Sequence, residues 1–135
     1  MTLAPKDLTE WAKGYFHAYE TGDRAFIADN MAPGFTFTSP FDDHIGREAY
    51  FARCWPHADI RRRFDFVAVM QAGDQVLVVY DATLGEASAV HPAARFRNAE
   101  RMTFEDGKLK SVEVFFGDPP AGLSRREFAA RSGAA

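Results

Sequence analysis

Hydrophobic positions in the first 55 residues recur three and four residues apart, which is the spacing of amphipathic helices. The pattern predicts three helices, over residues 7–23, 24–31 and 47–55. Asp7 with Glu10 resembles a capping box at the start of the first helix, and Asp23 can cap the second. Pro33-Gly34 is expected to end the second helix.

Beyond residue 62 the hydrophobic positions alternate with period two, which is typical of strands. Strands are expected over residues 63–72, 75–84, 93–105 and 108–117, after an earlier short strand over 35–41. Turn sequences at 72–74 and 105–107 separate two pairs of these strands. The acidic stretch 39–46 is interpreted as a loop, and Ser124 with Glu127 predicts a short helix in the C-terminal tail, 118–135.

Three helices followed by a strand meander predict an α+β fold, with the helices packed on one face of a curved antiparallel sheet. A length of 135 residues suits one domain, over residues 1–135. A twisted sheet that curls around a helix leaves a concave hollow, which is a favoured place for ligand pockets.

The strand over 93–105 predicts two different faces. The face expected to meet the helices carries Phe96, Asn98, Glu100, Met102 and Phe104. Even-numbered residues of 112–116 are expected on the same side. A glutamate among Phe and Met must be exposed, paired with a buried partner, or kept for chemistry.

Composition and charge exclude several classes of function. A net charge of −3 provides no positive surface for nucleic acid, and the run Arg61-Arg62-Arg63 is interpreted as a solvated strand edge. A single cysteine, Cys54, excludes an internal disulfide, and the four histidines lack metal-ligand spacing, so neither a metal nor a cofactor is expected. The N-terminus lacks the pattern of a standard signal peptide, and no apolar run approaches the ~18 residues of a membrane span. We therefore expect a cytoplasmic protein without membrane contact.

The order of elements resembles the nuclear-transport-factor-2-like (NTF2-like) cone of the cystatin-like α+β folds, and in particular its SnoaL-like branch. The stretches that carry the resemblance are YETGD at 19–23, FTFTSPFDDHIGREAY at 35–50 and DGKLKSVEVFFG at 106–117. In this order and spacing they cover nearly the whole chain. Function varies widely across this superfamily, so the fold alone decides little about activity.

Within the superfamily, the chain is distantly similar to ketosteroid isomerase. Alignment of the two puts that enzyme's hydrogen-bond-donating tyrosine at Tyr15 and its second, protonated aspartate at Glu100. Its proton-abstracting aspartate falls on Ser39, which precedes Pro40. Serine is no general base near neutral pH without an activating partner, so the resemblance does not imply the same mechanism.

Further candidates for chemistry are Asp81 and Tyr19. If Leu77 and Val79 face the hollow, Asp81 does too and could share acid and base roles with Glu100. Both faces of that strand are apolar, so Asp81 could equally lie in water at the strand end. Tyr15 and Tyr19 lie four residues apart on one helix face, where they either donate to a ligand or pack in the core.

The expected ligand is a hydrophobic small molecule that bears a carbonyl group. Asn98 could orient it, and an apolar wall would be formed by Trp55, Phe96, Met102, Val112, Val114 and Phe116. Further residues expected to contact the ligand are Tyr19, Ser39 and Phe51. Each of these residues has an alternative role in ordinary core packing.

Two classes of function remain. One is a cofactor-independent enzyme that transfers protons in an isomerisation, cyclisation or hydration, with Glu100 as acid or base and Tyr15 as hydrogen-bond donor. The other is a non-catalytic binding or dimeric interaction module. Epoxide hydrolysis is a narrower alternative, but the relatives that perform it place arginine between acids, whereas Arg95, Arg97 and Arg101 are expected to point outward. A homodimer through the sheet is predicted because Phe115 and Tyr80 would otherwise be exposed on the convex face.

Overall fold

A computed structural model describes residues 7–55, 62–85, 94–117 and Arg126. Within these ranges its elements are α1 (Leu8–Thr21), α2 (Arg24–Asp29), β1 (Met31–Ser39), β2 (Asp42–Ile45), α3 (Arg47–Cys54), β3 (Arg62–Ala72), β4 (Gln75–Leu84), β5 (Ala94–Glu105) and β6 (Lys108–Phe116).

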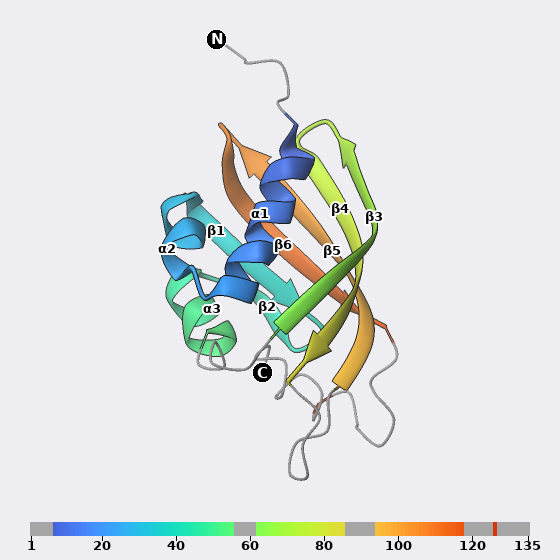
Figure 1. Cartoon of the computed structure of the whole chain (residues 1–135). Coiled ribbons are helices and arrows are strands. Elements are labelled where there is room, and N and C mark those ends of the chain that lie inside the picture. The colour runs from blue at the N-terminus through green and yellow to red at the C-terminus, as the bar shows by residue number, and fades with distance from the viewer. Residues whose placement is uncertain (1–6, 56–61, 86–93, 118–125, 127–135) are drawn as a thin grey trace.

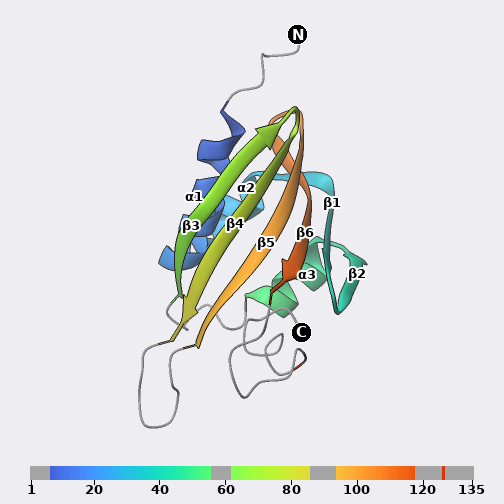
Figure 2. The ribbon, with the colours of Figure 1, turned by 90° about the vertical axis from the view of Figure 1, so that its right-hand side faces the viewer.

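The strands form one curved sheet in the order β2-β1-β6-β5-β4-β3. Strands β3 to β6 make the predicted antiparallel meander, while β1 lies parallel to β6. Helix α1 runs across one face of the sheet, and α2 and α3 lie on the same side near β1 (Figures 1 and 2). This arrangement confirms the α+β class, the NTF2-like cone and the position of the helices.

Local sequence signals set the ends of the first helices. The Asp7 carboxylate accepts a hydrogen bond from the backbone of Thr9 at 3.2 Å, and the Asp23 carboxylate accepts one from the backbone of Phe26 at 3.1 Å. Gly22 ends α1 in the left-handed region with φ of 74°, where glycine is least strained. Both predicted caps are confirmed.

Two expectations about the following segment are wrong. Helix α2 ends at Asp29, and Pro33-Gly34 lies inside β1 instead of ending the helix. The register of β1 against β6 shifts over this stretch, and such an irregularity accommodates a proline that cannot donate to the ladder. Residues 42–45 form strand β2 instead of a loop, and the backbone of His44 donates to the Thr38 hydroxyl at 3.1 Å.

The predicted register of β5 and β6 is confirmed. Phe96, Asn98, Glu100, Met102 and Phe104 are all buried on the helix side, as are Val112 and Val114. The arginines at 95, 97 and 101 point outward, with side chains that are at least half exposed. The predicted C-terminal helix lies outside the described residues.

The buried face of β4 is the one that carries Tyr80, and the opposite face carries Asp81. Val76, Val78, Tyr80 and Ala82 are the buried residues of this strand, so its even-numbered side chains face the helices. Tyr80 is therefore inside the molecule, and the prediction that it lies on the convex face is wrong. Because both faces of β4 are apolar, its alternation carried no signal that distinguished them.

Candidate active site

A cavity of about 80 Å³ lies between α1 and the inner face of the sheet. Its wall combines aromatic and apolar side chains with a few polar groups. It is lined by Tyr15, Phe16, Tyr19, Phe37, Cys54, Arg62, Phe64, Tyr80, Phe96, Asn98, Glu100, Val114 and Phe116. An apolar wall with a small set of converging polar groups is the usual composition of a small-molecule site.

Glu100 is the carboxyl group of this cavity. It projects from the middle of β5, between Val78 of β4 and Val114 of β6, and it is 7% exposed. The Tyr80 hydroxyl donates to Glu100 Oε2 at 2.6 Å. Burial raises the pKa of Glu100 from 4.5 to about 7, although the hydrogen bond from Tyr80 lowers it. Glu100 can therefore hold or release a proton near neutral pH.

Tyr80 and Asn98 form the surroundings of this carboxyl group. They are paired across β4 and β5, and the Asn98 side chain interacts with the Tyr80 hydroxyl. Burial raises the pKa of Tyr80 well above 10, so its hydroxyl stays protonated and remains a donor to Glu100. Asn98 Oδ1 also accepts from the backbone of Gly117 at 3.3 Å. Sequence reasoning missed Tyr80, since the apolar alternation of β4 suits either face.

Three tyrosine hydroxyls, which we call the tyrosine trio, meet on the helix side of the cavity. They belong to Tyr15 and Tyr19 of α1 and to Tyr50 of α3. The Tyr15 and Tyr50 hydroxyls are 2.6 Å apart, and the Tyr19 hydroxyl also contacts that of Tyr50. Burial raises the pKa of each of the three well above 10, so all keep their protons. Tyr50 was not predicted, because its contact joins residues 35 positions apart.

The tyrosine trio has one more hydroxyl proton than its internal contacts require. Three hydroxyls carry three protons, and the two contacts with Tyr50 use two of them. Tyr50 does not line the cavity, whereas Tyr15 and Tyr19 do. When Tyr50 donates to one of these two, the other donates to Tyr50, and the third hydroxyl proton can turn to a ligand oxygen in the cavity.

Arg62 places a positive charge in the same cavity wall. It is 8% exposed, and its guanidinium carbon lies 5.3 Å from the centre of the Tyr19 ring. The interpretation of the run 61–63 as a solvated edge is therefore wrong for Arg62, although Arg63 is exposed. Residue 62 shares the inward face with Phe64 at the start of β3, and only the packed sheet makes that face an interior.

Seven of the predicted site residues line the cavity, and they are Tyr15, Tyr19, Phe96, Asn98, Glu100, Val114 and Phe116. Met102 and Val112 are buried in the core, where they are 0% and 1% exposed. Phe51 and Trp55 line a separate, open hollow on the surface together with Arg24, Arg47, Glu48 and Ala52. Trp55 still packs against Tyr19, with ring centres 4.8 Å apart.

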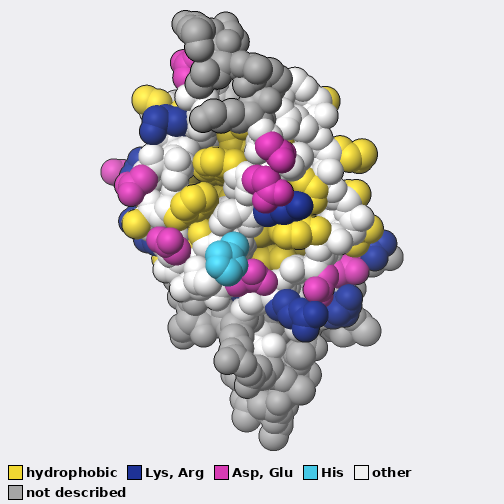
Figure 3. Space-filling model, turned by 45° about the horizontal axis from the view of Figure 1, so that its top comes forward, with side chains coloured by type: hydrophobic (Ala, Val, Ile, Leu, Met, Phe, Trp, Pro, Cys, Tyr) yellow, Lys and Arg dark blue, Asp and Glu magenta, His cyan; other side chains and the backbone are white. Residues whose placement is uncertain are grey.

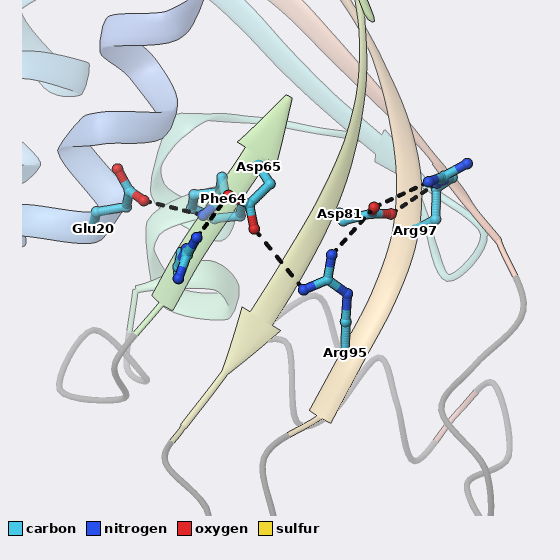
Figure 4. A network of polar contacts seen from close by, with 7 residues as sticks. Glu20, Phe64, Asp65, Asp81, Arg95 and Arg97 are labelled. Atoms are coloured by element: carbon cyan, nitrogen blue, oxygen red, sulfur yellow. Dashed lines mark hydrogen bonds and ion pairs between the residues drawn. The ribbon is translucent and has the colours of Figure 1, made fainter. Parts of the chain in front are cut away.

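The expectation that Asp81 faces the hollow is wrong. Asp81 lies on the outer face of β4, where Arg97 donates to its two carboxylate oxygens at 2.7 and 3.0 Å and Arg95 lies at 3.5 Å (Figure 4). The hydrogen bond from Arg97 lowers the pKa of Asp81. Asp81 therefore remains ionised in a surface ion-pair cluster that also includes Asp65.

Ser39 is also separate from the cavity wall. Its hydroxyl donates to Asp42 Oδ2 at 2.8 Å, and Asp42 pairs with Arg53 of α3. This cluster connects β1 and β2 to α3. In the described ranges, no group of three or more His, Cys, Asp or Glu side chains could hold a metal ion, and no helix is long and apolar enough to cross a membrane.

The outer surface on the helix side is mixed in character. Hydrophobic side chains lie between acidic and basic ones in the space-filling view (Figure 3). The cavity is the candidate active site because buried polar groups and apolar side chains line a space that a ligand can enter.

Comparisons with known proteins agree with this geometry. Residues 12–112 match the family model of the SnoaL-like domain. No curated protein matches the sequence. Among solved structures, an NTF2-like protein of unknown function from Burkholderia pseudomallei has a TM-score of 0.69 at 14% identity, covering 85% of this chain and 92% of its own.

Two further solved structures have the same fold and carry functional names. A candidate polyketide cyclase from Sinorhizobium meliloti has a TM-score of 0.63 at 18% identity, covering 83% of this chain and 99% of its own. An LEH-like epoxide hydrolase from M. tuberculosis has a TM-score of 0.60 at 10% identity, covering 78% and 79%. The match of the family model over most of the chain shows that the protein belongs to the SnoaL-like domain family.

Proposed function

We propose that the protein binds a hydrophobic, carbonyl-bearing small molecule in this cavity and catalyses proton transfer on it without a cofactor. The reaction would be an isomerisation, a cyclisation or a hydration. The observation that carries the proposal is Glu100, a buried carboxyl group with a pKa of about 7 in a cavity that also presents a tyrosine hydroxyl. Structural neighbours named as a candidate polyketide cyclase and an LEH-like epoxide hydrolase support an activity of this kind.

Glu100 and the tyrosine trio have complementary tasks in this proposal. Glu100, in its ionised form, removes a proton from the carbon next to the ligand carbonyl. The electron pair of that C–H bond forms a C=C bond to the carbonyl carbon, and the π electrons of the carbonyl move to its oxygen. This oxygen accepts the remaining hydroxyl proton of Tyr15 or Tyr19 as a hydrogen bond. In a ligand with a double bond between its β- and γ-carbons, protonated Glu100 then returns the proton to the γ-carbon. The double bond moves into conjugation with the carbonyl, which reforms, and the protein is restored. Phe96, Val114 and Phe116 exclude water during these steps.

Hydrogen exchange tests this function without knowledge of the natural substrate. The probe is 2-tetralone, an apolar ketone with acidic hydrogens, whose loss of α-hydrogens in D₂O is followed by proton NMR. The wild-type protein is expected to accelerate exchange above the buffer rate, and Glu100→Gln is expected to remove the acceleration because the amide is not a base. Asp81→Asn, which removes a carboxylate from the outer face, is the matched control and should keep it.

The second candidate function is a non-catalytic binding module. The observation that favours it is the hydrogen bond from Tyr80 to Glu100, which satisfies the carboxyl group without a ligand. The exchange experiment separates the two candidates. If wild type and Glu100→Gln both bind 2-tetralone and neither accelerates exchange, the catalytic proposal is wrong and the binding module is supported.

We also propose a homodimer formed through the convex face of the sheet. Ala68, Val79, Ala99 and Phe115 are neighbours in the register of four adjacent strands and make an apolar stripe on that face. Phe115 is 48% exposed. A second copy would cover this stripe, as sheet packing buries apolar faces in other proteins. Sedimentation is expected to show a dimer for the wild type and a monomer for Phe115→Glu, and a wild-type monomer at micromolar concentration would contradict the proposal.

A further inference from the structure

We propose that Arg62 binds an anionic oxygen group of the ligand, so that the compounds recognised carry a carboxylate, enolate or phenolate in addition to the carbonyl. This inference rests on the proposed function, because it concerns the same cavity. It narrows the substrate class from hydrophobic carbonyl compounds in general to acidic ones.

Arg62 faces the cavity, unlike the arginine that follows it in the sequence. It begins β3, pairs with Leu84 of β4, and shares its face with Phe64, which also lines the cavity. The next residue, Arg63, lies on the opposite face, and its side chain is 74% exposed. Two adjacent arginines thus have opposite environments, and the inward one is 8% exposed. Arg63 pairs with Asp65 on the outer face, whereas Arg62 lies in the cavity wall.

The chemistry of a buried guanidinium is the second argument. Moving a charged group out of water costs free energy that must be recovered from interactions with its surroundings. The ring of Tyr19 beneath Arg62 offers an attractive cation–π contact at 5.3 Å. A guanidinium also has five N–H donors in one plane, and it can engage several partners at once. This fork of donors matches the two oxygens of a carboxylate or the oxygen of an enolate.

The distance between Arg62 and Glu100 is the third argument. In the register of β4 they stand opposite Leu84 and Val78, which are six residues apart, so their side chains enter the cavity from different positions along the sheet. Burial and the Tyr80 hydrogen bond account for the pKa of Glu100, with no contribution from a cation. The pKa of the Cys54 thiol, by contrast, is raised by burial and by the charge of Glu100, and it is lowered by the charge of Arg62. The two groups therefore act on different parts of one cavity.

These positions indicate how a ligand would be oriented. Its acidic group would lie at Arg62 near the start of β3, and its carbonyl would lie toward Glu100 and the tyrosine trio. When Glu100 is protonated, Arg62 is the one charged side chain among the lining residues that the structure describes, and its guanidinium attracts an anion that enters the cavity. The ion pair would also fix the direction in which the ligand enters.

Two matched probes test the inference. 4-Acetylbenzoate and its methyl ester have the same aryl ketone and differ in the acidic group. Binding is measured by isothermal titration calorimetry for wild type, Arg62→Gln and Arg62→Lys, with Arg63→Gln as the control. Wild type and Arg63→Gln are expected to bind the acid at least about tenfold more tightly than the ester, since a charge-assisted contact contributes that much. Arg62→Gln should bind both equally, and Arg62→Lys should keep part of the preference.

The outcomes distinguish a failure of the Arg62 inference from a failure of the proposed function. Equal binding of the two probes to wild type, or an acid preference that persists in Arg62→Gln, overturns the inference and leaves the proposed function intact. Absence of binding of either probe to wild type overturns the inference and contradicts the proposed function as well. If Arg62→Gln does not fold, NMR of the wild type decides: the acid should shift the Arg62 Nε–H signal and the ester should not, and identical shifts would overturn the inference.

Discussion

Replacement of Glu100 by glutamine should change how the stability of the protein depends on pH. Glutamine has nearly the same shape as glutamate, and its side-chain carbonyl can still accept the hydrogen bond from Tyr80. What it lacks is the proton equilibrium of the carboxyl group. The Glu100→Gln variant therefore separates the electrostatic cost of burying a charge from the packing of the side chain.

The magnitude follows from the two pKa values of Glu100. In the unfolded chain the group titrates near 4.5, and burial raises its folded pKa to about 7. Between these values the folded state holds a proton that the unfolded state has lost, so the free energy of unfolding falls as pH rises. Each pH unit removes about 1.4 kcal/mol, and the whole interval removes about 3 kcal/mol. The stabilising contribution is complete below pH 4.5 and is lost above pH 7.

Urea unfolding at a series of pH values measures this effect. The fluorescence of Trp11 and Trp55 reports the transition for wild type and for Glu100→Gln. We expect the free energy of unfolding of the variant, relative to wild type, to rise by about 3 kcal/mol between roughly pH 4 and pH 8. The two proteins share all other titratable groups, so the contributions of those groups cancel when one free energy of unfolding is subtracted from the other.

A control variant shows whether the effect belongs to this site. Glu48→Gln removes an exposed carboxyl group from α3 and leaves Glu100 in place, so its stability should keep the same fall with pH as wild type. If the difference between Glu100→Gln and wild type stayed constant over the whole pH series, Glu100 would titrate alike in both states. The assignment of an acid or base role to a desolvated carboxyl group would then be refuted.

Three further substitutions test other parts of the reasoning. Tyr80→Phe removes the donor to Glu100, so carbon-detected NMR should find the carboxyl pKa above its wild-type value, and an unchanged titration would mean that the hydrogen bond is not formed in solution. Asp81→Asn should bind 2-tetralone as wild type does in a fluorescence titration, because Asp81 pairs with Arg97 outside the cavity; weakened binding would place it in the site after all. Gly117→Ala should lower stability in urea by about 1–3 kcal/mol, since its Cβ would overlap the carbonyl oxygen of Arg97, and an unchanged midpoint would show that the backbone can relax there.

The sequence predicted those features that depend on neighbouring residues. Strand β5 alternates apolar and charged residues so clearly that its inner face, with Glu100 in the middle, could be assigned without a structure. The cap at Asp23 is confirmed for the same reason, because a side chain three residues from its backbone partner needs no tertiary contact.

Prediction from the sequence was wrong or left open where the local pattern suited two conformations equally or favoured neither. Both faces of β4 are apolar, so the sequence left the face of Asp81 open and the prediction put Tyr80 on the wrong face. Residues 42–44 are polar, which favours a loop, yet residues 42–45 pair with β1 and form a strand. In each case long-range packing selected one of two conformations that the local sequence allows.

Much of the candidate site likewise depends on long-range packing that the local sequence does not reveal. The sequence by itself determined the helices, the strand meander and the inward position of Glu100. These features follow from the spacing of apolar residues along the chain, because that spacing decides which face of a helix or strand is buried. Only the tertiary structure brought Tyr50 to Tyr15, turned Tyr80 toward Glu100 and placed Arg62 in the cavity wall. The physical reason is burial: a carboxyl pKa near 7 and a usable hydroxyl proton arise when water is excluded, and exclusion requires elements distant in the chain to pack together.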